Sequence, residues 1–285
     1  MDPSQQDALD RLVAEIGEEI LARYNADDSS STPANHGQIF AAGASRVSAC
    51  ALLPNIDSSL ASQIDHTLLR ADATAADIHK ICCEARKYGF ASVCVNPYWV
   101  PLAVAELSGS TVKVCTVVGF PLGANSTTAK VAETENAVKL GASEIDMVIN
   151  IGELKGGNYD AVRQDIEAVA RAAHQGRAIL KVILETSLLD DNQKVIASTL
   201  SKVAGAEFVK TSTGFSTGGA TVHDVALMRQ VVGEEMGVKA SGGIRTLDDL
   251  KNMAAAGATR IGASASVKIM ETAQGKPQST TEGGY

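Results

Sequence analysis

The chain has few of the features that mark membrane, secreted and nucleic-acid-binding proteins. Its longest apolar runs fall short of the roughly 18–20 residues of a membrane span. Its start is polar and acidic, without the basic and apolar regions of a signal peptide. Lys and Arg number 25 against 33 Asp and Glu, and they form no basic block. Because nucleic acids are bound by clustered basic residues, the composition predicts neither a membrane nor a nucleic-acid partner.

Cysteine is also scarce, and its spacing does not suit a disulfide framework. The five cysteines are odd in number, include no CxxC pair and all lie within the first 115 residues. We therefore expect free thiols and a cytoplasmic protein. The sequence also contains no GxGxxG, Walker A, GxSxG or HExxH motif, the signatures of several common nucleotide-binding and hydrolytic sites.

Short β-branched runs alternate with helical stretches from residue 60 onward. The runs lie at residues 62–69, 91–97, 113–121, 144–150, 178–185, 207–212, 237–243 and 259–264. Nearly continuous apolar strands separated by helices are typical of a parallel sheet covered by helices. Eight such units predict an α/β fold, a closed (β/α)8 TIM barrel. An open doubly wound sheet is the alternative, although that fold usually carries the GxGxxG turn.

The segments before and after the predicted barrel have a different character. Apolar residues at three- and four-residue steps over 4–24 predict an N-terminal helical extension, and the polar stretch 25–37 predicts a linker. We divide the chain into the N-terminal helix and mobile linker (1–45), the barrel (46–270) and a flexible C-terminal tail (271–285). The helix is expected to pack on the outside or the bottom of the barrel, with partner binding as the alternative.

Single charged residues interrupt four of the apolar strands: Asp146, Lys181, Lys210 and Lys239. Because strand side chains alternate between faces, these four are expected to point into the barrel. Burial and like charge both favour a neutral amine, so at least one lysine is expected to have a lowered pKa. A neutral lysine can attack a carbonyl and form a Schiff base. The alternative is that the lysines pair with acids or bind an anion.

Turns rich in Gly, Ser and Thr follow the last three predicted strands, at 211–219, 241–246 and 262–266. In barrels, these loops and the helix that follows commonly bind phosphate through backbone N–H groups. Arg245 would add a positive charge. The sequence therefore predicts a phosphate site, with ordinary turn chemistry as the alternative.

Two weaker candidates remain. Asp65 and His66 are adjacent on the first predicted strand and could begin a metal site, but the other histidines lie in the predicted linker and helices. We therefore expect no metal. The strand parity does not decide whether Cys94 faces the lumen or the helices, and an inert buried thiol is the favoured interpretation.

The motifs around these residues resemble the deoxyribose-phosphate aldolases, class I aldolases of the DeoC type. The resemblance covers about residues 60–270 and rests on IDHTLL (64–69), SVCVNP (92–97), VVGFPLG (117–123), EIDMVINIG (144–152), LKVILET (180–186), FVKTSTGF (208–215), VKASGGIRT (238–246) and GAS (262–264). It implies a (β/α)8 barrel that reversibly cleaves 2-deoxy-D-ribose 5-phosphate to D-glyceraldehyde 3-phosphate and acetaldehyde, without metal or cofactor. The partners would be these small molecules, and a homo-oligomer is left open.

The resemblance also implies roles for individual residues. Lys210 of the KTSTG motif would form the Schiff base, Lys239 would lower the pKa of Lys210, and Asp146 would transfer protons. Lys181 and Cys94 match residues that line the family's pocket. The remaining substrate-binding positions would be Thr213, Gly214, Gly242, Gly243, Arg245, Gly262 and Ser264.

Some positions depart from the family pattern. Phe215 stands where some members carry a phosphate-binding lysine, and Ala265 follows Ser264 where some carry a second serine. Arg245 is then the candidate for neutralising the phosphate. The tail ends in Tyr285, whose phenol could assist protonation of the enamine carbon, although an unstructured end is the favoured interpretation.

Two other classes of function are kept as alternatives. A metal-dependent barrel hydrolase would use Asp65 and His66. A non-catalytic phosphosugar-binding barrel would keep the glycine-rich loops without a reactive amine.

Overall fold

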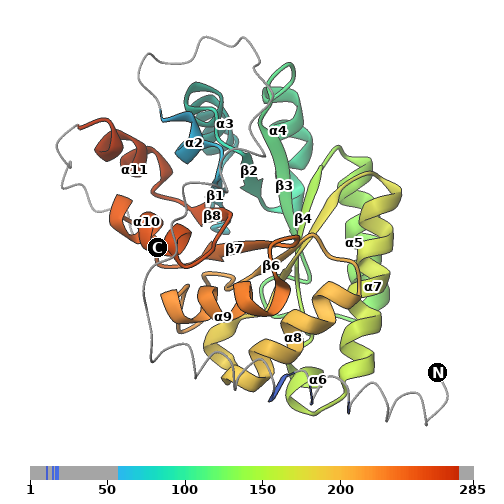
Figure 1. Cartoon of the computed structure of the whole chain (residues 1–285). Helices are drawn as coiled ribbons and strands as arrows, with labels where there is room; N and C mark the ends of the chain where they lie inside the picture. Colours follow the sequence, from blue (N-terminus) through green and yellow to red (C-terminus); the bar gives the residue numbers. More distant parts are fainter. Residues whose placement is uncertain (1–10, 12–14, 16, 19–56, 276–285) are drawn as a thin grey trace.

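In the described part of the chain, residues 11, 15, 17–18 and 57–275 of a computed structural model, parallel strands alternate with helices around a closed barrel (Figure 1). The strands are β1 (Ile64–Leu68), β2 (Ser92–Val95), β3 (Lys113–Val118), β4 (Glu144–Val148), β5 (Ile179–Ile183), β6 (Phe208–Lys210), β7 (Gly237–Ser241) and β8 (Arg260–Ala263). Each strand pairs in parallel with the next, and β8 pairs with β1. The predicted (β/α)8 TIM barrel is confirmed, and the open sheet is excluded.

The helices cover the outside of this barrel. They are α2 (Ser58–Ala61), α3 (Ala75–Tyr88), α4 (Val100–Glu106), α5 (Thr127–Lys139), α6 (Ile151–Lys155), α7 (Tyr159–Gln175), α8 (Asp191–Val203), α9 (Val222–Val232), α10 (Leu247–Ala255) and α11 (Ser266–Ala273), with short 3-10 helices η2 (Pro97–Trp99) and η3 (Thr186–Leu188). Local sequence sets several helix starts. Capping boxes begin α3 at Thr74, α8 at Asp190 and α10 at Thr246.

Alternation along the strands separates two buried regions. Ile145 and Met147 of β4 join the main hydrophobic core, between the sheet and the helices. The residues between them and before them, Asp146 and Glu144, are buried on the opposite face, which is the barrel lumen. The strand period therefore places apolar residues outward and charged residues inward.

The segments at the two ends of the barrel are described only in part. The predicted tail boundary at residue 270 falls inside α11, which continues to Ala273. Residues 11, 15, 17 and 18 are helical, and Gly17 lies against Asn192 and Val195 of α8. The predicted linker and Tyr285 lie outside the described residues. None of the helices in the described segments is long and apolar enough to span a membrane.

Candidate active site

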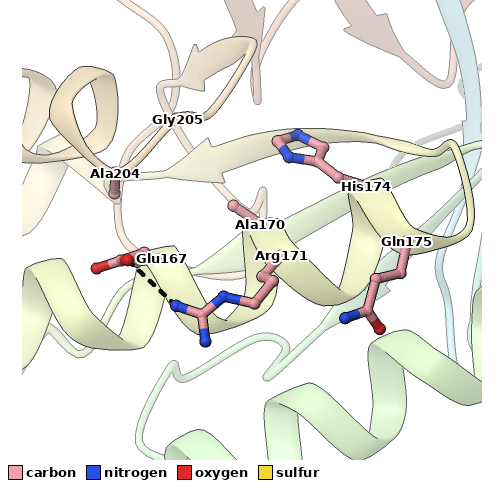
Figure 2. Close-up of a pocket in the computed structure, with 7 residues that line it drawn as sticks. All are labelled: Glu167, Ala170, Arg171, His174, Gln175, Ala204 and Gly205. Carbon is pink, nitrogen blue, oxygen red and sulfur yellow. Dashed lines mark hydrogen bonds and ion pairs between the residues drawn. The ribbon is translucent and has the colours of Figure 1, made fainter.

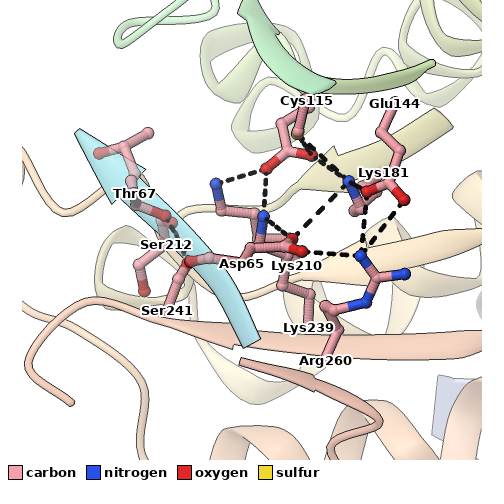
Figure 3. Close-up of polar contacts among 12 residues, drawn as sticks. Asp65, Thr67, Cys115, Glu144, Lys181, Lys210, Ser212, Lys239, Ser241 and Arg260 are labelled. Atoms are coloured by element: carbon pink, nitrogen blue, oxygen red, sulfur yellow. Dashed lines mark hydrogen bonds and ion pairs between the residues drawn. The ribbon is translucent and has the colours of Figure 1, made fainter. Parts of the chain in front are cut away.

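Seven charged side chains meet inside the barrel (Figure 3). The carboxylates are Asp65 on β1 and Glu144 and Asp146 on β4. The cations are Lys181 on β5, Lys210 on β6, Lys239 on β7 and Arg260 on β8. The sequence prediction that Asp146 and the three lysines face the lumen is correct. Because each residue comes from a different strand or strand position, the closed barrel is what brings the group together.

Asp146 lies at the centre of the cluster. Its Oδ2 atom accepts hydrogen bonds from Lys210 Nζ at 2.8 Å and Lys239 Nζ at 2.7 Å. Its Oδ1 atom accepts from Lys181 Nζ at 2.9 Å and from the Cys115 thiol at 3.1 Å. Burial alone would raise the pKa of Asp146, but the ammonium groups of the three lysines outweigh it and hold the pKa well below its usual range.

A second layer of charges lies beneath Asp146. Arg260 Nη1 lies 2.7 Å from Asp65 Oδ1 and 3.0 Å from Glu144 Oε2. Lys239 Nζ pairs with Asp65 Oδ2 at 2.5 Å, and Lys181 Nζ pairs with Glu144 Oε2 at 2.6 Å. Burial would raise the pKa of Asp65, but Arg260, Lys239 and Lys181 together lower it. Each of these carboxylates therefore faces at least two cations.

These acids change the expected titration of the lysines. Burial would lower the pKa of Lys181 and of Lys239, but the surrounding carboxylates, Asp146 foremost, raise both above their usual value. The sequence predicts a lowered pKa for at least one of the three lysines, and Lys181 and Lys239 are not that lysine. The sequence interpretation counted one lumenal carboxylate, whereas the barrel closes three into the same space.

Lys210 differs from the other two lysines in its partners. It is 2% exposed and pairs with Asp146 alone among the described carboxylates, sharing the Oδ2 atom with Lys239. With Arg260 included, the cluster contains four cations and three carboxylates. Lys210 is therefore the cation with the fewest acidic contacts, and the cluster has one positive charge in excess when all groups are ionised.

The other half of the lumen is apolar. Cys94 faces inward and packs with Leu69, Cys115 and Val117, and Phe120 covers this small cluster. The Phe120 ring meets the edge of the Phe215 ring at a centroid distance of 5.3 Å. The question that the sequence left open is thus settled: Cys94 lies in the lumen, beside the charged residues.

The loops after β6 and β7 are tied together at the carboxyl end of the barrel. Ser241 Oγ donates to the Ser212 carbonyl at 2.6 Å, and the Ala220 amide donates to the Gly242 carbonyl at 3.0 Å. Gly214, Gly242 and Gly243 have φ angles of 85°, 88° and 80°, a region that favours glycine. The two glycine-rich turns are therefore joined by hydrogen bonds at the end of the barrel that follows Lys210.

The remaining predicted binding residues are placed differently from one another. Thr213 is buried in the loop, whereas Arg245 and Ser264 are exposed. Gly262 is buried within β8, where an added Cβ would lie 3.2 Å from Lys239 Cε and 3.0 Å from Ser241 Cβ. Gly262 thus leaves room for the Lys239 side chain rather than belonging to the exposed turn.

Asp65 and His66 do not form the pair that a metal site would need. Asp65 points into the lumen, where its Oδ1 atom accepts from Ser92 Oγ at 2.6 Å. His66 points to the outer side, where Nε2 lies 2.8 Å from Glu84 Oε2 and the ring packs against Phe90. Adjacent strand residues face opposite sides, so the basis for the metal-hydrolase alternative is removed.

Glu185 belongs to the LKVILET motif, but sequence reasoning gave it no role. This residue ends the β5 run in the left-handed region (φ 57°, ψ 61°), although it is not a glycine, and it is 2% exposed. Its Oε2 atom accepts from the Thr213 amide at 3.2 Å and from Thr213 Oγ1 at 2.5 Å. A carboxylate ending an apolar strand was the available signal. Glu144 was missed too, although it shares the strand face of Asp146.

A shallow groove lies elsewhere on the surface, between the ends of α7 and α8 (Figure 2). His174 and Gln175 come before β5, and Gly205 comes before β6, so the groove lies at the amino end of the strands. The loops that follow Lys210 and Lys239 lie at the other end of the barrel. The groove is therefore not the active site.

Comparison with known proteins agrees with this geometry. The family described as DeoC/LacD family aldolase matches residues 59–272. The chain belongs to this family. A deoxyribose-phosphate aldolase of Streptococcus gordonii is 63% identical over 214 residues, which cover 74% of this chain and 96% of that protein.

Solved structures agree with the family assignment. A crystal structure of a Coccidioides immitis protein assigned as a deoxyribose-phosphate aldolase has a TM-score of 0.74 at 43% identity, over 90% of this chain and 98% of that one. The tetrameric Aeropyrum pernix deoxyribose phosphate aldolase has a TM-score of 0.72 at 36% identity, over 76% of this chain and 92% of that one. These comparisons confirm the prediction that the chain is a deoxyribose-phosphate aldolase.

Proposed function

We propose that Lys210 carries the Schiff base through which this aldolase reversibly cleaves 2-deoxy-D-ribose 5-phosphate to D-glyceraldehyde 3-phosphate and acetaldehyde. The supporting observation is the charge balance of the lumen. Four cations surround three carboxylates, and Lys210 has the fewest acidic partners. Loss of its proton makes the cluster neutral and leaves a nucleophilic amine.

The other two lysines are less suited to this role. Lys181 contacts Glu144 and Asp146, and Lys239 contacts Asp65 and Asp146. If either lysine lost its proton, buried carboxylates would have fewer cations beside them, and the folded protein would be less stable. Both therefore remain protonated and hold Asp146 in its charged form.

The proposed reaction begins at Lys210. Lys210 Nζ attacks the aldehyde carbon of the open-chain sugar phosphate, and loss of water gives an iminium ion. The bond between C2 and C3 of the sugar then breaks, and its electron pair moves to the iminium. The C3 hydroxyl loses its proton in the same step. Glyceraldehyde 3-phosphate leaves, the enamine carbon is protonated, and hydrolysis releases acetaldehyde. The contacts of Asp146 with Lys210 and Lys181, both within 3 Å, support its assignment to proton transfer.

We assign phosphate binding to the turns 211–219, 241–246 and 262–266. The first two turns are supported by the hydrogen bonds that join them and by the exposed Arg245 at the same end, and the third by its position at the carboxyl end of β8. Phe215 supplies no charge at the position after the TSTG sequence. The phosphate is therefore bound by backbone N–H groups, hydroxyls and one arginine.

Reductive trapping tests the proposal. Acetaldehyde with borohydride should add an ethyl group to Lys210, located by peptide mapping, and activity should be lost in parallel. The Lys210→Met variant should not be modified at the neighbouring lysines. Modification found mainly on Lys181 or Lys239 would refute the assignment, and the absence of any adduct would favour the non-catalytic phosphosugar-binding barrel.

We also propose a cytoplasmic homo-oligomer. The reducing compartment is supported by the free cysteines of the described segments, Cys82, Cys83, Cys94 and Cys115. The oligomer is supported by the tetrameric Aeropyrum pernix relative. Light scattering during size-exclusion chromatography would measure the number of subunits.

A further inference from the structure

Two cysteines face each other in the lumen beside the charged cluster. Cys94 of β2 and Cys115 of β3 are direct partners in the parallel strand register, and both are fully buried. Their Sγ atoms and a carboxylate oxygen of Asp146 all lie within 4.8 Å of one another. We propose that Cys94 and Cys115 form a reversible disulfide when a peroxide enters the substrate-free lumen, and that this disulfide switches the aldolase off.

The backbone spacing suits such a bond. Neighbouring strands lie about 4.8 Å apart, and disulfides join Cα atoms separated by about 4.4–6.8 Å. In a closed barrel the inward Cα–Cβ bonds converge toward the axis, so the Cβ atoms of paired residues approach more closely than on a flat sheet. The register of the two strands is therefore compatible with such a bond.

The two thiols are also chemically unequal. The neighbouring Cys115 side chain and the ammonium groups of Lys239 and Lys210 lower the pKa of Cys94, although burial opposes this. Burial is the main cause that raises the pKa of Cys115. Cys94 is therefore the attacking thiolate, and Cys115 is the thiol that resolves the oxidised form.

The other cysteines of the described segments lack this arrangement. Burial raises the pKa of Cys82 to about 12, and Cys83 is exposed. These two are consecutive residues of α3, so their side chains do not face each other. Cys83 is an internal control, because it would be oxidised before the lumenal cysteines if exposure alone decided the reaction.

Access to the thiols rests on the proposed function. Lys210 is 2% exposed, so an aldehyde that reacts with it must enter the lumen by an opening at the carboxyl end. Hydrogen peroxide is smaller than acetaldehyde and can follow the same route. Bound substrate fills this route, so it should protect the thiols.

The chemistry balances with one peroxide. The Cys94 thiolate attacks a peroxide oxygen and becomes a sulfenic acid, and the peroxide's O–O bond breaks to release water once a proton is taken up. The Cys115 sulfur then attacks the sulfenic sulfur, forming the disulfide and releasing a second water. Two thiols are oxidised, and one hydrogen peroxide is reduced to two waters.

The disulfide would disturb the proposed proton transfer. The Cys115 thiol donates to Asp146 Oδ1 at 3.1 Å and accepts from Lys181 Nζ at 3.3 Å (Figure 3). A disulfide sulfur has no proton, so Asp146 loses one donor and its carboxylate is free to shift. We expect activity to fall by about tenfold or more, because misplacing a proton-transfer group impairs general acid–base catalysis.

Peptide mapping under non-reducing conditions tests the proposal independently of activity. After hydrogen peroxide treatment, the peptide that contains Cys94 should be linked to the peptide that contains Cys115, and dithiothreitol should separate them and restore activity. Deoxyribose 5-phosphate present during oxidation should slow the linkage. The Cys83→Ser variant should show the same linkage and the same loss.

The Cys115→Ala variant provides the decisive control. Without the resolving thiol, Cys94 should proceed to a sulfinic acid, and dithiothreitol should no longer restore activity. If this variant does not fold, dimedone should still trap the sulfenic acid on Cys94 of the unmodified chain. Inactive, peroxide-treated enzyme in which both lumenal thiols can still be alkylated after unfolding would overturn the proposal. If the disulfide formed in the expected yield but borohydride trapped no adduct on Lys210, the Lys210 assignment would be refuted and the disulfide proposal would stand.

Discussion

At the scale of single residues, the lumen shows how an amine can be selected by its neighbours. Lys210 and Lys239 share one oxygen of Asp146, and Lys239 has Asp65 as a second anion. A protonated Lys239 therefore repels a proton on Lys210 while remaining paired itself. This contact between like charges is the reason for the role of Lys239 in the proposed mechanism, where Lys210 is the nucleophile.

Replacing Lys239 with leucine tests that relation. Without the neighbouring ammonium group, Lys210 becomes the main counterion of Asp146 Oδ2, so a higher pH should be needed to remove its proton. The increase of rate with pH should then move to higher pH. The rate at neutral pH should fall by about tenfold for each pH unit through which that increase moves.

The pH–rate profile measures both effects. A Lys80→Leu variant, which changes an exposed lysine of α3, should leave the profile unchanged. If the Lys239→Leu variant kept the pH–rate profile of the unmodified chain, the proposed electrostatic role of Lys239 would be refuted.

Glu185 provides a second residue-scale prediction. Its backbone lies in the left-handed region, and its carboxylate accepts from the amide and hydroxyl of Thr213. Thr213 Oγ1 in turn accepts from the Phe215 amide at 3.0 Å. Glu185→Ala should loosen the loop that follows Lys210 and raise KM for the sugar phosphate by about tenfold, the value of a hydrogen bond to a charged group.

The matched variants separate positioning from general disruption. Glu185→Gln keeps an acceptor oxygen and should retain most of the affinity. Thr213→Val removes the hydroxyl partner, so adding it to Glu185→Ala should cost much less than the two separate effects combined. Equal KM values for the Ala and Gln variants would show that the carboxylate does not position the loop.

Arg245 tests the phosphate assignment. It is exposed at the start of α10, where its amide donates to Asp249 at 3.0 Å and fixes the turn. Arg245→Ala should raise KM for deoxyribose 5-phosphate and leave kcat little changed, because it removes binding common to the ground and transition states. Deoxyribose without the phosphate should show no such effect. A KM equal to that of the unmodified chain would place the guanidinium elsewhere.

At the scale of elements, close approach between strands is as important as charge. β8 passes behind the Lys239 side chain at Gly262, where a Cβ would contact Lys239 Cε. A Cβ at position 262 would crowd Lys239, so the side chain that β7 directs toward Asp146 would have to shift. The pairing of β7 with β8 brings Gly262 beside Lys239 and Ser241, so the small residue is required by the barrel and not by local sequence.

Gly262→Ala should therefore impair catalysis more than folding. The extra methyl group should displace Lys239 and lower kcat, with a loss of unfolding free energy of about 1–3 kcal/mol as in other overpacked cores. Gly205→Ala is the matched control, because that glycine has φ of +86° and no atom within 4 Å of an added Cβ. The control should lose stability through backbone strain but keep kcat. Urea unfolding and steady-state kinetics measure the two effects.

At the scale of the whole molecule, the lumenal charges tie stability to pH. The pKa values of Asp65 and Asp146 are lowered on folding, so their contribution is fully present above about pH 4 and is lost as the pH falls. The pKa values of Lys181 and Lys239 are raised, so their contribution is present below about pH 10.5 and is lost only at higher pH. The free energy of unfolding should therefore be nearly constant between these limits.

Urea unfolding from pH 7 down to pH 2 tests this expectation. Stability should begin to fall below about pH 4 and continue to fall toward the lowest pH, by up to about 1.4 kcal/mol per pH unit for each such aspartate. Asp65→Asn should cost about 3–5 kcal/mol at pH 7, because it leaves buried cations with reduced compensation, and its acid decline should be shallower. An acid decline as steep as that of the unmodified chain would exclude Asp65 as its source.

Local patterns in the chain were enough to predict the fold and part of the site. Hydrophobic periodicity located all eight strands, because a buried parallel strand needs a continuous apolar run. Strand parity placed Asp146 and the three lysines in the lumen for the same local reason. The motif KTSTG and its neighbours then indicated the aldolase family, which the matched residues 59–272 confirm.

The electrostatics of the site, by contrast, follow from contacts between distant segments. Asp65, Glu144 and Arg260 come from strands that are far apart in the sequence, and only barrel closure brings them within 3 Å of one another or of a lysine. The carboxylates raise the pKa values of Lys181 and Lys239, because a pKa depends on every charge in the surrounding space. Barrel closure also pairs Cys94 with Cys115 and forms the hydrogen bond between Thr213 and Glu185. Both contacts join segments that are distant in the sequence, so local patterns could not predict them.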